Sequence, residues 1–178
     1  KQAANMPRLQ HDEPQGLFAE AIRSALTGVR LSMMHVDRPI IGVTSSSPGT
    51  TFSATGVYVD DPSSNAFAIS AGSPTLDAVH VFSAGSYGMA LSGTASPTVR
   101  NSIVRNGASI GIYWTSSGNL TVQSCTFNAN SSSAVQSSSS TGPVTVSNSV
   151  ITNHSSWGLY ASSFGTISVS YSDIWRNA

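Results

Sequence analysis

The segment Ser96–Trp114, SPTVRNSIVRNGASIGIYW, decides how the whole chain is interpreted. Its valines and isoleucines fit neither the period of a helix nor a single alternating strand. The same order of short apolar runs, broken by Asn, Gly and Ser, returns in NLTVQSCTFNANSSSAVQS (119–137) and in PVTVSNSVITNHSSWGLYA (143–161). The segment is therefore one copy of a repeat.

The period of the repeat is 23 or 24 residues. One apolar position recurs at Val29, Phe52, Leu76, Val99, Val122, Val146 and Val169. A second, five residues later, is Met34, Val57, Val81, Val104, Phe127, Ile151 and Ile174. A third, thirteen residues after the first, is Met89, Ile112, Val135 and Leu159, which Phe67 joins if its repeat carries two extra residues. A unit this short cannot bury a face alone, so successive units must stack.

Each unit contains three short β-branched runs, such as PTVRN, IVRN and SIGIYW, separated by turn residues. The regular Leu spacing of leucine-rich repeats and the amphipathic runs of helical repeats are both missing. Three strands per unit predict an all-β fold, a parallel β-helix solenoid of about six coils that rise about 4.8 Å each.

The repeats PTVRNSIVRNG, VTVSNSVITNH and ISVSYSDIWRN resemble those of the right-handed parallel β-helix superfamily, which includes pectate lyases and tailspikes. The resemblance runs from about Gly28 to Ala178. It implies a right-handed solenoid, and it identifies Asn101 and Asn148 as remnants of an asparagine ladder at a turn. Because the superfamily contains lyases, hydrolases, binders and inert stalks, the resemblance implies a fold and not an activity.

The two ends of the repeat region differ. Leu17, Phe18, Ala21, Ile22 and Leu26 have helical spacing, which predicts an α-helix over residues 16–27 that caps the first coil, or that belongs to a neighbouring domain. Residues 1–15 are polar and predict an extended arm or linker. The β-helix of residues 28–178 stops before the third strand of its last coil. We therefore expect a fragment of a longer β-helix, or subunits stacked end to end.

Charged residues make up only 9% of the 178 residues, far below the roughly 25% of ordinary soluble domains. Eight basic residues balance eight acidic ones, which argues against a nucleic-acid partner. No apolar run reaches the roughly 18 residues of a membrane-spanning helix. Cys125 is the only cysteine, so no internal disulfide is expected. Three sequons, at Asn119, Asn130 and Asn153, permit a secreted glycoprotein.

Aromatic residues suggest one candidate site. Tyr113 and Tyr160 share a repeat position two coils apart, and Trp114 and Trp157 lie close to them in the sequence, as does Tyr87. An aromatic strip on the outside of a solenoid can stack on sugar rings. The alternative is that these rings pack against turns or inside the coil.

Asp77 and Arg100 also share a repeat position, on adjacent coils, and predict a pair across the ladder. This pair is either the acid–base couple of a polysaccharide lyase or an exposed ion pair of little energetic value. Asp60 and Asp61 predict a solvated turn rather than a calcium site, and the histidines have no spacing suited to a shared metal. We expect no catalytic residue, metal or cofactor.

Together these patterns predict a non-catalytic β-helix segment of an extracellular or cell-surface protein, which acts as a rigid structural and interaction module. Its expected partners are other domains of a longer chain or stacked subunits, with glycans as a further class. The alternative function is a carbohydrate-binding or carbohydrate-active protein, a lyase or hydrolase. Ice binding, suggested by the threonine column from Thr51 to Thr145, is disfavoured because the neighbouring column is uneven.

Overall fold

The computed structural model describes residues 53–138, 141–162 and 165–178. The predicted arm (residues 1–15), the predicted capping helix (16–27) and the first part of the predicted solenoid (28–52) lie outside these residues. The described residues form strands and turns only, so no helix among them is long and apolar enough to cross a membrane. The predicted all-β class is confirmed.

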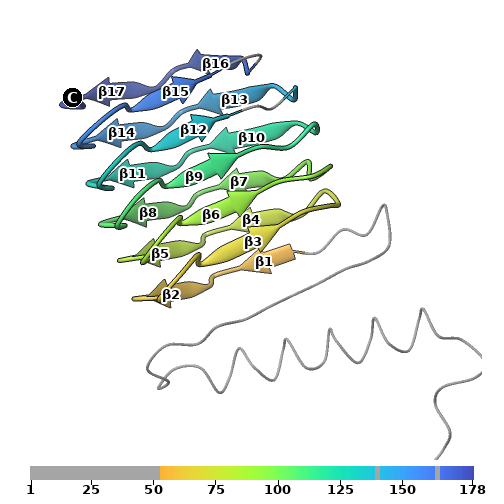
Figure 1. Ribbon diagram of the computed structural model, residues 1–178, viewed down its shortest axis with the longest axis horizontal. Coiled ribbons are helices and arrows are strands. Elements are labelled where there is room, and N and C mark those ends of the chain that lie inside the picture. Colours follow the sequence, from red (N-terminus) through yellow and green to blue (C-terminus); the bar gives the residue numbers. More distant parts are fainter. Residues whose placement is uncertain (1–52, 139–140, 163–164) are drawn as a thin grey trace, which may run out of the picture. The chain divides into compact units, whose positions relative to one another are not determined.

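Seventeen short strands form three parallel sheets in the described residues (Figure 1). The first sheet contains β1 (Ser53–Thr55), β4 (Thr75–Asp77), β7 (Thr98–Arg100), β10 (Leu120–Gln123), β13 (Val144–Ser147) and β16 (Ile167–Ser170). The second contains β2 (Tyr58–Asp60), β5 (His80–Phe82), β8 (Ile103–Arg105), β11 (Thr126–Asn128), β14 (Val150–Thr152) and β17 (Asp173–Trp175). The third contains β3 (Phe67–Ile69), β6 (Met89–Leu91), β9 (Ile112–Trp114), β12 (Val135–Ser137) and β15 (Leu159–Ala161).

Three consecutive strands, one from each sheet, make one coil, and each strand pairs with its counterparts in the coils on either side. The described residues hold five complete coils and the first two strands of a sixth. The described residues thus form a parallel β-solenoid, as the repeat predicted (Figure 1).

The register of the first described coil differs from the sequence prediction. Ala54 pairs with Leu76, and Val59 pairs with Val81, so these two residues take the positions assigned to Phe52 and Val57. Counted from Ala54, Phe67 falls at the third apolar position, so this repeat does not contain the two extra residues that the sequence predicted. Phe52 and Val57 are five residues apart, as are Ala54 and Val59, so both pairs fit the spacing of the repeat. The prediction chose the wrong pair because Ala54 is too small to be recognised as a core residue.

The core is a stack of like positions inside the solenoid. Leu76, Val99, Val122 and Val146 are completely buried in the first sheet, and Val81, Phe127 and Ile151 in the second. Met89, Ile112 and Val135 fill the third sheet in the same way. Leu159, at the same apolar position, is only partly buried, because β15 is the last described strand of its sheet. Each core residue is therefore covered by its counterparts above and below.

Single residues with positive φ bend the chain at two corners of every coil, with φ between 48° and 65°. The corner between the first and second sheets is formed by Gly56, Ala78, Asn101, Ser124, Asn148 and Tyr171. The corner after the second sheet is formed by Asp61, Ser83, Asn106, Ala129, Asn153 and Arg176. Asn and Gly adopt this conformation most readily, and they fill five of these twelve corner positions.

Hydroxyl side chains link the coils beside the corner between the first and second sheets, which we call the first corner; the corner after the second sheet is the second corner. Ser102 Oγ accepts a hydrogen bond from the Val79 amide at 3.1 Å, and Ser149 Oγ accepts one from the Cys125 amide at the same distance. Asn101, predicted to belong to an asparagine ladder there, instead donates to the carboxylate of Asp77. The ladder at this corner is formed by serines, one residue after the asparagine positions.

Candidate functional site

Two stacked aromatic pairs lie along the third sheet. The Tyr87 and Tyr113 rings have centroids 4.7 Å apart and planes tilted by 25°. The Trp157 and Tyr160 rings are 6.0 Å apart and tilted by 23°. We call these four residues the aromatic strip. Tyr87, which the sequence placed near these rings, lies two residues before β6, as Trp157 does before β15.

The register of the third sheet sets the spacing of the strip. Tyr113 pairs with Gln136, and Gln136 pairs with Tyr160, so the two tyrosines lie two coils apart in one column. At about 4.8 Å per coil, this corresponds to about 10 Å. Trp157 is 54% exposed and Tyr160 36%. The strip therefore offers aromatic surface to the solvent at two points, with the amide of Gln136 between them.

Trp114 does not belong to the aromatic strip, which corrects the sequence prediction. Its side chain is completely buried, and its Nε1 donates a hydrogen bond to the Gly142 carbonyl at 3.2 Å. Successive residues of a strand point to opposite faces, so an outward Tyr113 requires an inward Trp114. Trp114 is a core residue and has no surface to offer a ligand.

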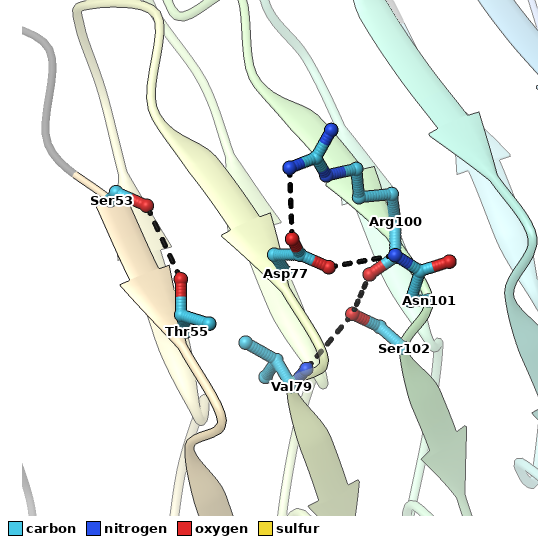
Figure 2. Close-up of polar contacts among 7 residues, drawn as sticks. All are labelled: Ser53, Thr55, Asp77, Val79, Arg100, Asn101 and Ser102. Carbon is cyan, nitrogen blue, oxygen red and sulfur yellow. Dashed lines mark hydrogen bonds and ion pairs between the residues drawn. The ribbon is translucent and has the colours of Figure 1, made fainter.

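Asp77 and Arg100 form the predicted pair, on adjacent strands of the first sheet (Figure 2). Arg100 Nη2 lies 2.9 Å from Asp77 Oδ2, and Asn101 Nδ2 donates to Asp77 Oδ1 at 2.8 Å. The Asn101 amide, together with Arg100, holds the pKa of the Asp77 carboxyl below its ordinary value. A carboxylate with a lowered pKa is a weaker base.

The ion pair and the aromatic strip lie on different sheets, the first and the third, so they do not form one site. The Arg100 side chain is 48% exposed and the Asp77 side chain 20%. Exposed pairs of this kind contribute little to stability. The geometry is that of a surface ion pair with an additional amide contact, and no second carboxylate pairs with it in the adjacent strands, where Thr55 and Gln123 occupy the same column.

A comparison with protein families identifies the fold. The model of the right-handed β-helix region matches residues 40–178. The chain belongs to this family. No curated protein and no solved structure matches it. The right-handed coil that the resemblance implied is thus the fold of the family, while the activity of this β-helix has to be argued from its own side chains.

The three sequons of this β-helix are not equivalent. Asn119 and Asn153 are exposed. Asn130 is 1% exposed, its Oδ1 accepts the Gly107 amide at 3.0 Å, and its Nδ2 donates to the Val104 carbonyl at 3.4 Å. The folded β-helix has no room for a glycan on Asn130, so the predicted set is reduced to Asn119 and Asn153.

The thiol side chain of Cys125 is buried inside the coil. Burial raises the pKa of the Cys125 thiol to about 11, and its Sγ donates to the Gln123 carbonyl at 3.2 Å. Cys125 therefore stays protonated at neutral pH and takes the place of a serine in the ladder beside the first corner. Within the described ranges, no three His, Cys, Asp or Glu residues gather to form a metal site.

Proposed function

We propose that this β-helix is a non-catalytic, rigid module of an extracellular or cell-surface protein, which separates other parts of that protein and presents flat sheets to partners. The observation that carries the proposal is the shortness of every connection. The second and third sheets are joined by six residues in each described coil, for example 106–111, and the first and second by two, for example 101–102. Binding clefts are usually built from longer loops on a scaffold.

An activity screen tests the non-catalytic part of the proposal. The chain is incubated with acidic and neutral polysaccharides, and new reducing ends and unsaturated products are measured. We expect no depolymerisation. Depolymerisation that is lost in Asp77→Asn or Arg100→Gln, and retained in Asp173→Asn, would overturn the proposal and make the ion pair catalytic. Asp173 is a matched control because it is an exposed aspartate on another sheet.

We also propose a second function, the binding of an extended, neutral glycan, which the aromatic strip favours. Tyr113 and Tyr160 lie in one column about 10 Å apart, far enough for successive sugar rings of one chain to contact both. The column also contains Ala68, Ala90 and Gln136 and thus no charged residue. A strip without charge suits a neutral glycan better than an acidic one.

Calorimetry with neutral oligosaccharides tests the second function. Tyr113→Ala combined with Tyr160→Ala should weaken binding roughly tenfold or more, since an aromatic contact contributes about 0.5–1.5 kcal/mol. Tyr171→Ala is the matched control, because Tyr171 is 90% exposed but lies at the first corner. Equal binding by the double variant and the control would refute a role for the strip.

We further propose that another β-helical coil, from the same protein or from a stacked subunit, covers the last described coil. Its core positions Val169 and Ile174 are 45% and 41% exposed, and Trp175 is 44% exposed. Unpaired strand edges with apolar side chains favour the addition of further strands. Light scattering of the 178-residue chain tests this proposal. Association that Val169→Asp abolishes would support it, and a monomer at high concentration would contradict stacking by a second copy.

A further inference from the structure

A column of three polar side chains joins the last coils beside the second corner. Asn130, His154 and Asn177 occupy the same position in successive coils, 24 and 23 residues apart. Asn130 Oδ1 accepts the Gly107 amide at 3.0 Å, and Asn177 Oδ1 accepts the His154 amide at 3.1 Å. Between them, His154 Nδ1 accepts the Asn130 amide at 3.2 Å. A histidine thus performs, in one coil, the task that an asparagine performs in its neighbours.

The hydrogen bond to Asn130 fixes the protonation state of His154. A backbone amide can only donate, so Nδ1 must carry a lone pair and the single ring proton must be on Nε2. The side chain is 2% exposed, and Nε2 is buried without a hydrogen-bond partner. The ring is therefore a neutral imidazole that serves the adjacent coil as an acceptor.

Protonation removes this acceptor. A protonated imidazole donates from both nitrogens, so the Nδ1 proton would face the Asn130 amide proton, and a charge would be buried. An amide oxygen, as in Asn130 and Asn177, does not titrate in this range. Of the hydrogen bonds in this column, only the one accepted by His154 depends on pH.

The surroundings offer little compensation for a positive charge. The chain contains no Asp or Glu between Ala78 and Ser172. In the coil stacked on His154, the titratable groups are Tyr171, Asp173 and Arg176, and the guanidinium of Arg176 lies over the Trp175 ring at 4.7 Å. In its own coil the other titratable group is Tyr160, and the preceding coil contributes only the buried Cys125 thiol. Two carboxylates lie near this column: Asp173, which is exposed on the second sheet, and the α-carboxylate of Ala178 in the 178-residue chain, which is also exposed and whose residue donates its amide to the His154 carbonyl at 3.2 Å.

Buried side-chain polar atoms without a hydrogen-bond partner occur in the two coils that meet at His154. Among the described residues, three buried side-chain polar atoms have no partner: Ser133 Oγ, Thr152 Oγ1 and His154 Nε2. All three belong to the two coils that meet at His154.

We propose that His154 is an acid-sensitive joint in the solenoid: protonation of Nδ1 releases the Asn130 amide and loosens the coils that follow Ser137 from those before it. Acidification should therefore weaken the contact between coils at His154, while the hydrogen bonds that Asn130 and Asn177 accept in the same column do not depend on pH.

The direction of the pH effect follows from the burial of the ring. Burial lowers the pKa of His154 below its ordinary value of 6.5, and this effect outweighs the opposing contacts of the ring with the backbone of Asn130 and Phe127. Below about pH 6.5 the opened state takes up a proton that the closed state resists, so the joint loses stability as the pH falls. For one group, the opening equilibrium changes by at most about tenfold per pH unit, and the loss ends once the pH is below the lowered pKa.

Amide hydrogen exchange of the full chain tests the joint. The protection factor of the Asn130 amide is followed from about pH 7.5 to about pH 5, a range that brackets the ordinary histidine pKa. We expect it to fall by up to about tenfold per pH unit, while the Gly107 amide, bonded to Asn130 Oδ1, changes less. In His154→Asn, which places the residue of the neighbouring coils in this position, the Asn130 protection should not depend on pH. A pH-independent Asn130 in the unaltered chain, or an equal fall in the variant, would overturn the proposal.

A second measurement does not require a variant that folds. The ¹⁵N chemical shifts of the His154 ring report which nitrogen carries the proton. At about pH 7.5 we expect the proton on Nε2 and a titration midpoint below the ordinary histidine value of 6.5. A proton on Nδ1, or a midpoint at or above that ordinary value, would contradict the proposed acceptor role.

Discussion

The middle coils and the last described coil carry the same kinds of residue and differ in what covers them. Val146 and Ile151 are completely buried, whereas Val169 and Ile174, which pair with them in the next coil, are 45% and 41% exposed. The sequence pattern is the same in both coils. The difference teaches that burial in this protein is provided by the adjacent coil, and that no coil has a core of its own.

The largest expected effect comes from a charge placed in each region. Val122→Asp buries an unpaired carboxylate in the middle of the stack, and we expect it to lower the free energy of unfolding by about 3–5 kcal/mol, enough to unfold many domains. Val169→Asp places the same charge at an exposed position and should cost about 1 kcal/mol or less. Chemical denaturation measures both. If both variants lost the same free energy of unfolding, the difference between the regions would be refuted. If Val122→Asp unfolded with the same free energy as the unaltered chain, the register would be refuted.

A smaller difference is expected at the glycines before the third sheet. A Cβ on Gly111 would lie 2.5 Å from the Ala134 carbonyl oxygen, a backbone atom that cannot move away. Gly111→Ala should therefore cost about 1–3 kcal/mol by overpacking. The three atoms nearest to a Cβ on Gly158 would all be side-chain atoms, of Asn177, Ile174 and Ile151, which yield more easily than a backbone carbonyl. Gly158→Ala should cost less, and thermal melts that rank the two variants in the opposite order would contradict this account.

A third comparison uses thiol reactivity and leaves stability almost unchanged. Raising the Cys125 pKa from 9.0 to about 11 reduces its thiolate fraction at neutral pH about a hundredfold, and burial blocks access further. Cys125→Ser combined with Ser172→Cys moves the thiol to the equivalent position of the last described coil, which is only partly buried. We expect alkylation of the native protein to be at least about a hundredfold faster in this variant. Similar rates would show that the last coil is as well covered as the middle.

Much of the fold was predictable from the sequence because stacking imposes the same constraint in each coil. The apolar columns that contain Val99, Val104 and Ile112 were identified correctly, and they form the core. The register failed at Ala54, where a small residue occupies a core position and Phe52 offered a better apolar match. Large apolar residues are enough to locate a repeat in the sequence. In a coil whose apolar pattern is weak, however, the register is set by the hydrogen bonds between strands and cannot be found from the pattern alone.

The candidate site was less predictable, because it depends on which way side chains point. Trp114 was named as a candidate sugar-binding ring beside the alternative of packing inside the coil, and alternation along β9 places it inside once Tyr113 is outside. The burial of Asn130 could not be predicted from its sequon, which contains no information on whether the side-chain amide accepts a hydrogen bond from the preceding coil. The role of His154 had a visible signal, its alignment with Asn130 and Asn177, but its significance depends on the Asn130 amide bond.

The central claim, that each coil is stabilised by its neighbours, is tested most directly by residue-specific amide hydrogen exchange at neutral pH. The account predicts that amides in β7 to β12 exchange only through global unfolding, with one common free energy. Amides in β16 and β17 should exchange faster through local opening, since their core residues Val169 and Ile174 are exposed. Uniform protection from β7 through Ile174 in a monomeric chain would contradict the claim.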